Sequence, residues 1–128
     1  MNEKVKYWIE LSDYDFETAE AMLASGRYLY VGFMCHQTIE KIIKSYFCFK
    51  SDEVPPFSHN LSYLAEKSGL NDILTDEYRY FINLLEPLNI EARYPTHKEE
   101  LLKSLSKERC EEILVNTKKF QKWVKERL

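Results

Sequence analysis

The sequence predicts an all-α protein, an antiparallel up-and-down bundle of four long helices and one short helix. Three observations lead to this prediction. Apolar residues recur every three or four positions along most of the chain, which is the period of a helix that packs on one face. Glycine and proline are scarce, with 3 and 4 among 128 residues, so few positions would break a helix. No segment sustains a two-residue alternation, so no sheet is expected.

Length and composition narrow the class of protein. A chain of 128 residues fits one domain, and we expect a single helical domain over residues 1–128 that buries its core without disulfides or metal. The composition is 45% hydrophobic and 30% charged, which is typical of a globular protein and not of a disordered one. The net charge of -3 argues against a bulk nucleic-acid binder but is compatible with a local basic site.

Cysteine usage and apolar run lengths predict a protein of the reducing cytoplasm. The cysteines are three, an odd number, and have no CxxC spacing, so neither a disulfide framework nor a zinc site is expected. Residues 1–8 carry charges where a signal peptide would be apolar. No run approaches the roughly 18 apolar residues of a membrane helix. We therefore predict no membrane association, no metal and no cofactor.

The first two predicted helices are joined by a tight turn. The first runs from Glu3 to Ala24 and ends at Ser25-Gly26, where glycine adopts a left-handed cap without strain. The second runs from Arg27 to Phe49 and is apolar nearly all round, which predicts a buried central helix or one face of an oligomer. It ends before Val54-Pro55-Pro56, because the residue before a proline avoids the α region.

Three further helical segments follow. A short one is predicted from Asn60 to Ser68, and a longer one from about Thr75 to Glu91. Pro87 interrupts the longer segment, so we expect a kink there or two short helices, because proline removes a backbone hydrogen bond and clashes with the preceding turn. The last helix begins at Lys98 or at Ser106 and continues to the C-terminus.

Polar residues on the apolar second helix form the first candidate site. His36, Glu40 and Lys44 stand four apart and share one stripe, and Gln37 and Lys41 form a second stripe beside it. Ionisable groups beside a buried surface cost free energy unless they are paired. The stripes are therefore either the one solvent-exposed face of the helix, with Glu40 paired to Lys44, or the lining of a polar cleft. In such a cleft His36 would serve as an acid, a base or a hydrogen-bond donor.

The second candidate site is the segment from Glu91 to His97. Arg93 stands beside Tyr94 in a loop stiffened by proline, which suits planar recognition of a phosphate or a base edge. His97 lies four residues after Arg93. The alternative is a helix C-terminus whose carbonyl groups attract the Arg93 side chain.

Four other polar residues receive structural assignments. His59 and Asn60 are expected to cap the short helix in preference to binding a ligand. Asp13 and Asp15 are assigned to a solvated face of the first helix, from which Asp13 could reach a basic residue across the bundle.

Several short motifs, taken in order, resemble the HEPN domain family. They are Tyr7-Trp8 with Asp13 and Ala19, Gly26-Arg27-Tyr28, Phe33 with His36-Gln37-x-x-Glu40-Lys41, His59-Asn60-Leu61, and Glu91-Ala92-Arg93-Tyr94-Pro95. The resemblance extends from about Tyr7 to Val124. Each motif is short, and the order and spacing of the set make the resemblance specific.

The resemblance implies an antiparallel helical bundle that forms homodimers, with polar residues in a cleft at or near the dimer interface. Many prokaryotic members are paired with a minimal nucleotidyltransferase in toxin–antitoxin-like systems, and nucleotide binding has been proposed for the family. Other members are metal-independent ribonucleases, marked by an Arg followed by a His after four to six residues. Here only three residues separate Arg93 from His97, so the chain departs from that motif.

The leading prediction is a dimeric regulatory subunit that binds a nucleotide or a nucleotidyltransferase partner. The predicted ligand-binding residues are Arg27, His36, Glu40, Lys41, Arg93 and Tyr94. One alternative is a metal-independent endoribonuclease toxin, in which Arg93 would stabilise developing charge on RNA and His97 or His36 would act as the base. The other alternative is a protein–protein interaction scaffold without a small-molecule site. The 9 Tyr, 7 Phe and 2 Trp favour it, because aromatic side chains supply large rigid contact areas.

Overall fold

A computed structural model describes residues 2–90 and 95–128 of the chain, with side chains at residues 2–89 and 99–128. This part is helical and contains no strand, which confirms the all-α prediction. The elements are α1 (Glu3–Ala24), α2 (Tyr28–Lys50), α3 (Leu61–Ser68), the 3-10 turn η1 (Leu70–Asp72), α4 (Asp76–Ile90), α5 (Pro95–Ser104) and α6 (Lys107–Lys125).

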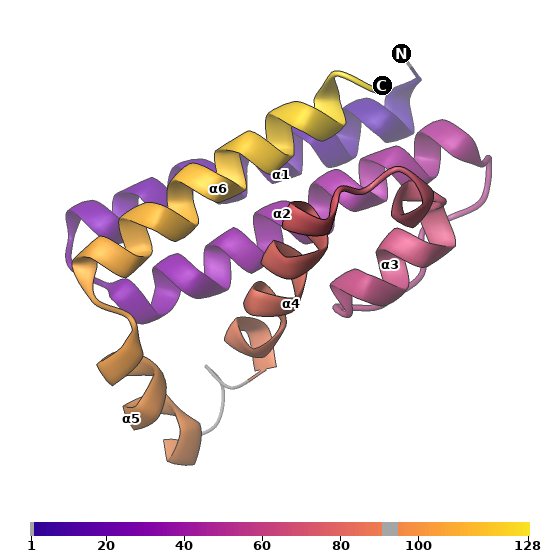
Figure 1. The fold of residues 1–128 in the computed structure, drawn as a ribbon. Coiled ribbons are helices and arrows are strands. Elements are labelled where there is room, and N and C mark those ends of the chain that lie inside the picture. Colours follow the sequence, from indigo (N-terminus) through magenta and orange to yellow (C-terminus); the bar gives the residue numbers. More distant parts are fainter. Residues whose placement is uncertain (1, 91–94) are drawn as a thin grey trace.

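Helix α2 is the centre of the bundle, as its composition predicts. It packs against α1, α3, α4, α5 and α6 (Figure 1). Helices α1 and α2 are antiparallel, and α6 lies along both of them so that the two chain ends meet at one end of the molecule (Figure 1). Helices α3 and α4 cover another side of α2. The two groups of polar residues described below are therefore built around α2.

Local sequence signals set most of the helix ends. The Asn2 side chain accepts a hydrogen bond from the Val5 N–H at 2.9 Å and begins α1, and the Ser106 hydroxyl accepts one from the Arg109 N–H at 3.1 Å and begins α6. Gly26 follows α1 with φ +74°, and Gly69 ends α3 with φ +83°. Both glycines adopt the left-handed conformation that other residues rarely reach.

The second half of the chain confirms one predicted helix start and corrects two other expectations. The last helix, α6, begins after the Ser106 cap, which was one of the two predicted starts, and a separate helix, α5, precedes it and ends at Ser104. Helix α5 starts at Pro95 and not at Lys98; proline suits the first helical position, where its missing N–H costs nothing. Helix α4 runs through Pro87 as one helix, so of the two alternatives predicted there the split into two short helices is wrong.

The packing around Pro87 explains why α4 continues. Leu85 is fully buried and Leu88 is 6% exposed, so both sides of the proline are held by the core. Leu88 also lies against Gly32 of α2, where an added Cβ would stand 3.1 Å from the leucine Cδ1. Close approach of the two helices at this glycine anchors the last turns of α4, and this packing offsets the lost backbone hydrogen bond.

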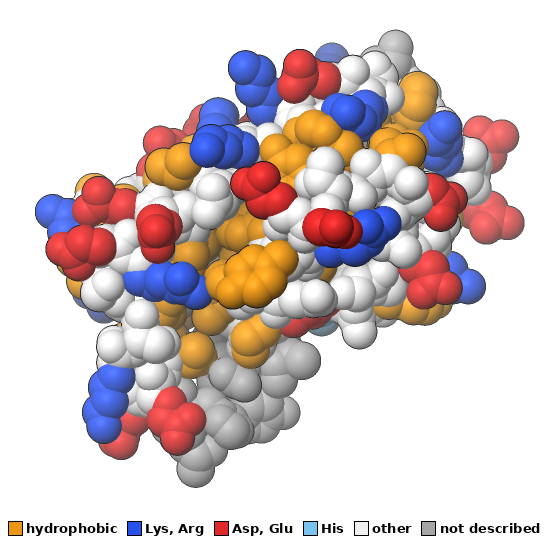
Figure 2. Space-filling model, viewed as in Figure 1, with side chains coloured by type: hydrophobic (Ala, Val, Ile, Leu, Met, Phe, Trp, Pro, Cys, Tyr) orange, Lys and Arg blue, Asp and Glu red, His pale blue; other side chains and the backbone are white. Residues whose placement is uncertain are grey.

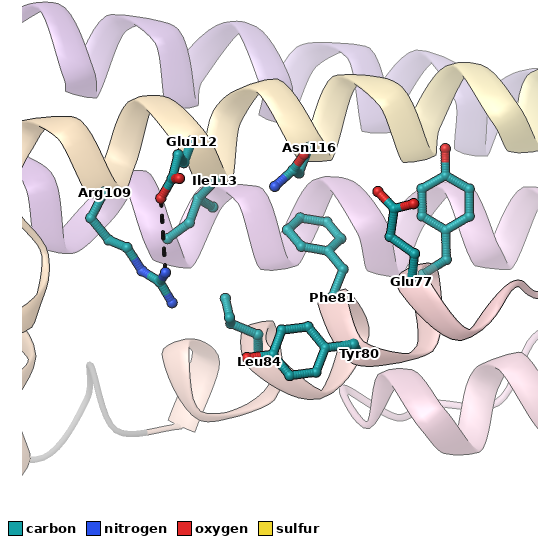
Figure 3. A pocket seen from close by; sticks show the side chains of 9 residues that line it. Glu77, Tyr80, Phe81, Leu84, Arg109, Glu112, Ile113 and Asn116 are labelled. Atoms are coloured by element: carbon teal, nitrogen blue, oxygen red, sulfur yellow. Dashed lines mark ion pairs between the residues drawn. The ribbon is translucent and has the colours of Figure 1, made fainter.

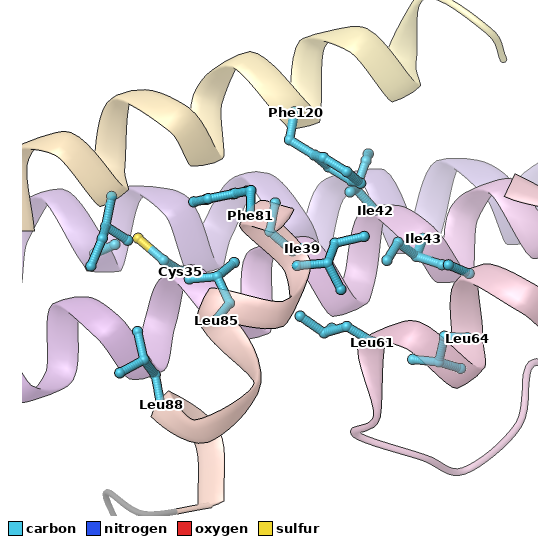
Figure 4. Packing of buried hydrophobic residues seen from close by; sticks show 14 of the residues in the cluster. Cys35, Ile39, Ile42, Ile43, Leu61, Leu64, Phe81, Leu85, Leu88 and Phe120 are labelled. Carbon is cyan, nitrogen blue, oxygen red and sulfur yellow. The ribbon is translucent and has the colours of Figure 1, made fainter. Parts of the chain in front are cut away.

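The core is a continuous set of aliphatic and aromatic side chains from α2, α3, α4 and α6. Ile39, Ile42 and Ile43 of α2 are fully buried at its centre, between Leu85 of α4 and Phe120 of α6 (Figure 4). No helix of the described chain is both long enough and apolar enough to cross a membrane.

The three cysteines are expected to resist alkylation until the protein unfolds. Cys35, Cys48 and Cys110 are unpaired and buried. Burial raises the pKa of Cys35 to about 12 and that of Cys110 to about 11, and the pKa of Cys48 is also raised by burial. Because the thiolate is the nucleophile, the native thiols should react with iodoacetamide at pH 8 far more slowly than the same protein in denaturant. Mass spectrometry of the labelled protein measures both rates. Rapid labelling of native Cys35 would contradict this expectation.

Candidate functional site

The polar residues of α2 fall into two neighbouring groups with different surroundings. The first, here called the inner polar cluster, consists of His36, Glu40 and Lys44 of α2 together with His59 and Glu86. The α2 members are 0%, 2% and 7% exposed, so this stripe is not a wet face of the helix, and that interpretation was wrong. Glu86 of α4, His59 from the loop before α3 and Trp8 of α1 lie against it.

Glu40 is the centre of the inner polar cluster. Its Oε2 is 3.1 Å from the Lys44 Nζ, which confirms the predicted pairing, and its Oε1 is 2.8 Å from the His59 Nδ1. The Lys44 ammonium also lies over the Trp8 ring, 5.3 Å from its centroid. A carboxylate this buried is stable only with such partners, because removal from water penalises its charge. His59 therefore bonds Glu40, and Asn60 alone caps α3 by accepting from the Tyr63 N–H at 2.9 Å.

His36 is the least satisfied member of the inner polar cluster. It is fully buried, and neither ring nitrogen has a hydrogen-bond partner among the described residues. Its Nε2 lies 4.0 Å from the Oε2 of Glu86 of α4, which is too long for a hydrogen bond. Buried polar groups are usually hydrogen-bonded, so the unsatisfied His36 ring beside this carboxylate is an exception among buried side chains.

Glu86 is held in its charged form. Burial by itself would raise its pKa, but the adjacent His36 ring and the backbone N–H of Ser62, which donates to Oε1 at 3.0 Å, outweigh burial, and the pKa is lowered. The carboxylate thereby links α4 to the first turn of α3 and to α2. Its side chain is 25% exposed, so it stands at the edge of the buried cluster.

The lowered pKa of Glu86 predicts a stability that falls in acid. Its folded pKa lies below the ordinary value of 4.5, so near that pH the unfolded chain binds more protons than the folded one. The stabilisation is complete above pH 4.5 and is lost as the pH falls through the folded pKa. Urea unfolding of the wild type and Glu86→Gln, from pH 6 to pH 3, should give a shallower acid slope for the variant. Parallel slopes would contradict this role, and the exposed Glu66→Gln is the control.

The second group, here called the outer polar chain, joins three helices and is only partly buried. Asp15 of α1 accepts from the Lys41 ammonium at 2.8 Å, Lys41 donates to the Gln37 Oε1 at 3.0 Å, and the Gln37 amide donates to the Asn89 Oδ1 of α4 at 3.0 Å. The Lys41 and Asp15 side chains are only 18% and 14% exposed. Asp15 is thus a paired residue, and its assignment to a solvated face was wrong because the α1–α2 contact covers it.

Asp13 behaves as predicted. Its Oδ1 lies 2.6 Å from the Lys125 Nζ of α6 and accepts from the Gln121 amide at 2.9 Å. Gln121 also donates to the hydroxyl of buried Ser12 at 3.0 Å. This contact fastens the C-terminal helix to α1 and lies away from the two polar groups of α2.

The predicted ligand-binding residues occupy several places. His36, Glu40 and Lys41 lie within two turns of α2. Arg27 is the exposed residue that precedes α2, about 20 Å from Lys41 along the helix axis at a rise of 1.5 Å per residue. Arg93 and Tyr94 lie outside the described residues, as does the side chain of His97, and the predicted site as a whole stays a prediction.

Two residues of these groups were not predicted from the sequence. Glu86 and Asn89 of α4 reach His36 and Gln37. They stand three apart, so they share one face of α4, and Asn89 is 2% exposed. A polar pair at helical spacing within an apolar face was the signal that could have pointed to them. Among the described residues no group of three or more His, Cys, Asp or Glu could hold a metal ion.

Comparisons with known proteins agree with this architecture. The crystal structure of TT1696 from Thermus thermophilus is similar to this chain with a TM-score of 0.81, over 99% of this chain and 100% of that one, at 19% sequence identity. At that identity the similarity concerns the fold. No curated protein matches the sequence. The model of the HEPN domain matches residues 5–127, nearly the whole chain, and the chain therefore belongs to the HEPN domain family.

Proposed function

We propose that this HEPN domain is a dimeric regulatory subunit that binds a nucleotide, or a nucleotidyltransferase that carries one, in a toxin–antitoxin-like pair. The observation that supports the proposal is one stripe of α2 that is not completely buried. Between Leu29 and Cys48 every residue of α2 is buried except five that follow helical spacing: Tyr30, Phe33, Met34, Gln37 and Lys41.

The composition of this stripe suits an interface. Tyr30 is 50% exposed, and Tyr14, beside Asp15 on the neighbouring helix α1, is 69% exposed. Exposed aromatic side chains are typical of interface cores, where they bury area at little entropic cost. The outer polar chain on the same stripe is already held in place by its own hydrogen bonds, so binding would order few of its side chains.

The same stripe suits an anionic ligand at the dimer interface. In this proposal Lys41 and Arg93 meet phosphate, Tyr94 stacks on a base, and His36 and Glu40 hydrogen-bond polar groups. Arg27 would contact the ligand or its protein carrier from the end of α2. His36 is fully buried and Glu40 is 2% exposed, so contact of either side chain with a nucleotide or with an RNA 2′-hydroxyl requires the segments that cover them to move.

Light scattering at micromolar concentration tests the dimer. The expected mass is twice that of the 15.3 kDa monomer. Tyr30→Glu should yield a monomer, since a charge would be buried in the interface, and the matched control Tyr80→Glu, on the 71% exposed Tyr80 of α4, should not. A wild-type monomer would refute the dimeric half of the proposal.

Titration calorimetry and thermal melting with ATP and other nucleotides test the ligand. Binding should release heat and raise the melting temperature. Lys41→Met should weaken nucleotide binding, while Lys122→Met, at an exposed position of α6, should not. Absence of heat and of any melting shift would refute nucleotide binding. Copurification with a coexpressed minimal nucleotidyltransferase then tests the partner, and incubation with RNA tests the endoribonuclease alternative. Cleavage abolished by Arg93→Ala would favour that alternative.

A further inference from the structure

A second surface, separate from the polar stripes of α2, lies where α4 and α6 diverge. The two helices meet at Tyr78, whose ring stands 5.2 Å from the Phe120 ring and 5.2 Å from the Trp123 ring. Beyond this aromatic contact they leave a hollow of about 190 Å³, here called the α4–α6 groove (Figure 3). Figure 2 shows the same face of the molecule, with hydrophobic side chains bordered by acidic and basic ones.

The inside of the α4–α6 groove is apolar. Phe81 and Ile113 reach into it from opposite helices and are 6% and 2% exposed, and Leu84 continues the wall. Tyr80 stands at the rim and is 71% exposed, although its ring borders this apolar hollow. The volume is sufficient for one large side chain, since a cavity of about 150 Å³ accommodates a benzene ring. An exposed aromatic beside a hollow of this size is a typical anchor point of a protein interface.

The rim of the α4–α6 groove is acidic. Glu77 and Glu112 line it, and the one cation among its described lining residues is Arg109, 4.0 Å from Glu112. The Glu112 side chain is 72% exposed, and its carboxylate can therefore bind a further cation beside Arg109. The adjoining shallow hollow on α6 is lined by Glu108, Glu111, Glu112, Val115 and Asn116, with no cation among them. These carboxylates would repel a nucleotide and attract a basic group.

We infer that the α4–α6 groove is a docking site for a basic amphipathic segment of a partner protein. The segment places one large apolar side chain between Tyr80 and Ile113 and lays lysine or arginine residues along Glu77 and Glu112. The charge of the rim selects this occupant, and a basic side chain can also rest its aliphatic stem on the Tyr80 ring. The inference does not depend on nucleotide binding or on dimerisation, because it uses none of the residues of the α2 stripe.

Random peptides displayed on phage, selected on the full-length protein at low salt, test the inference. The enriched peptides should carry net positive charge and at least one Trp, Phe or Leu. Synthetic copies should bind the wild type, lose affinity as salt rises, and bind Tyr80→Ala and Glu112→Lys about tenfold more weakly. Both substituted side chains are largely exposed, so the variants should keep the wild-type melting temperature.

Matched controls lie elsewhere on the molecule. Phe57→Ala removes an aromatic that is 99% exposed in the loop before α3, and Glu66→Lys reverses an exposed carboxylate on α3. Both should bind the selected peptides as the wild type does. Failure to enrich any peptide would overturn the inference, as would a selected pool without positive charge. Equal affinity for the wild type, Tyr80→Ala and Glu112→Lys would overturn it as well.

Discussion

Replacing Lys44 with methionine is expected to lower the free energy of unfolding by about 3 kcal/mol. Lys44 is 7% exposed, and its ammonium is 3.1 Å from the Oε2 of Glu40, which is itself 2% exposed. Methionine fills similar space but leaves the buried carboxylate with the His59 ring as its remaining partner among the described residues. Urea denaturation at pH 7 measures the loss.

The double variant Glu40→Met/Lys44→Met is the control for this effect. It removes both charges together, so it should be within about 1 kcal/mol of the wild type, because burying an ion pair gains little over burying apolar side chains. His59 is 55% exposed at its side chain and would return to water. A double variant as unstable as Lys44→Met would show that packing, and not the unpaired carboxylate, causes the loss.

Replacing Phe120 with alanine is expected to cost about 4 kcal/mol, the largest single loss that we predict. The ring is fully buried and packs on Tyr78 and Trp123, with centroids 5.2 and 6.1 Å away. Its removal leaves a cavity at the point where α4, α6 and α2 meet, and the surrounding helices cannot close it completely. Calorimetric melting and urea denaturation both measure the effect.

Two variants define the scale of the Phe120 result. Phe120→Leu keeps most of the apolar volume and should lose less than half as much as Phe120→Ala. Tyr80→Ala, on the exposed rim of the α4–α6 groove, should change stability by about 0.5 kcal/mol or less. If Phe120→Ala cost no more than Tyr80→Ala, the aromatic contact would not be what joins α4 to α6.

The two predictions concern the two sides of α2. Glu40 and Lys44 lie on the buried side of the helix, where each charge is stabilised by pairing with the other. Phe120 packs on the apolar side, which carries the C-terminal helix. Between Leu29 and Cys48, the stripe from Tyr30 to Lys41 is the part of the helix that is not completely buried. We propose that a second copy of the chain and a ligand bind there.

The helices themselves could be predicted from sequence because their signals are local. The first predicted helix has the bounds that the structure shows, Glu3–Ala24, since a capping side chain and a glycine mark its ends. The prediction failed where two local signals compete. Proline argues against a helix interior at Pro87, yet it suits a helix start at Pro95, and only the packing of the neighbouring residues decides between these effects.

The polar residues of α2 could be found from sequence, but their environment could not. Spacing of four residues places His36, Glu40 and Lys44 on one stripe whatever surrounds the helix. Whether that stripe is exposed to solvent or buried depends on segments that follow later in the chain and pack on it. Among them, Glu86 and Asn89 of α4 complete the two polar groups. The α4–α6 groove had no sequence signal at all, because its walls come from helices about thirty residues apart.

The sequence by itself determined that this protein is helical, where most helices begin and end, that its second helix is central, and that it resembles the HEPN domain family. These properties follow from periodicity, caps and short motifs, each within a few helical turns. Only the tertiary structure decided which α2 residues are covered, which carboxylates find a cation, and which stripe stays open. Those outcomes depend on contacts between distant segments, and burial there changes the free energy of a charge far more than any local preference does.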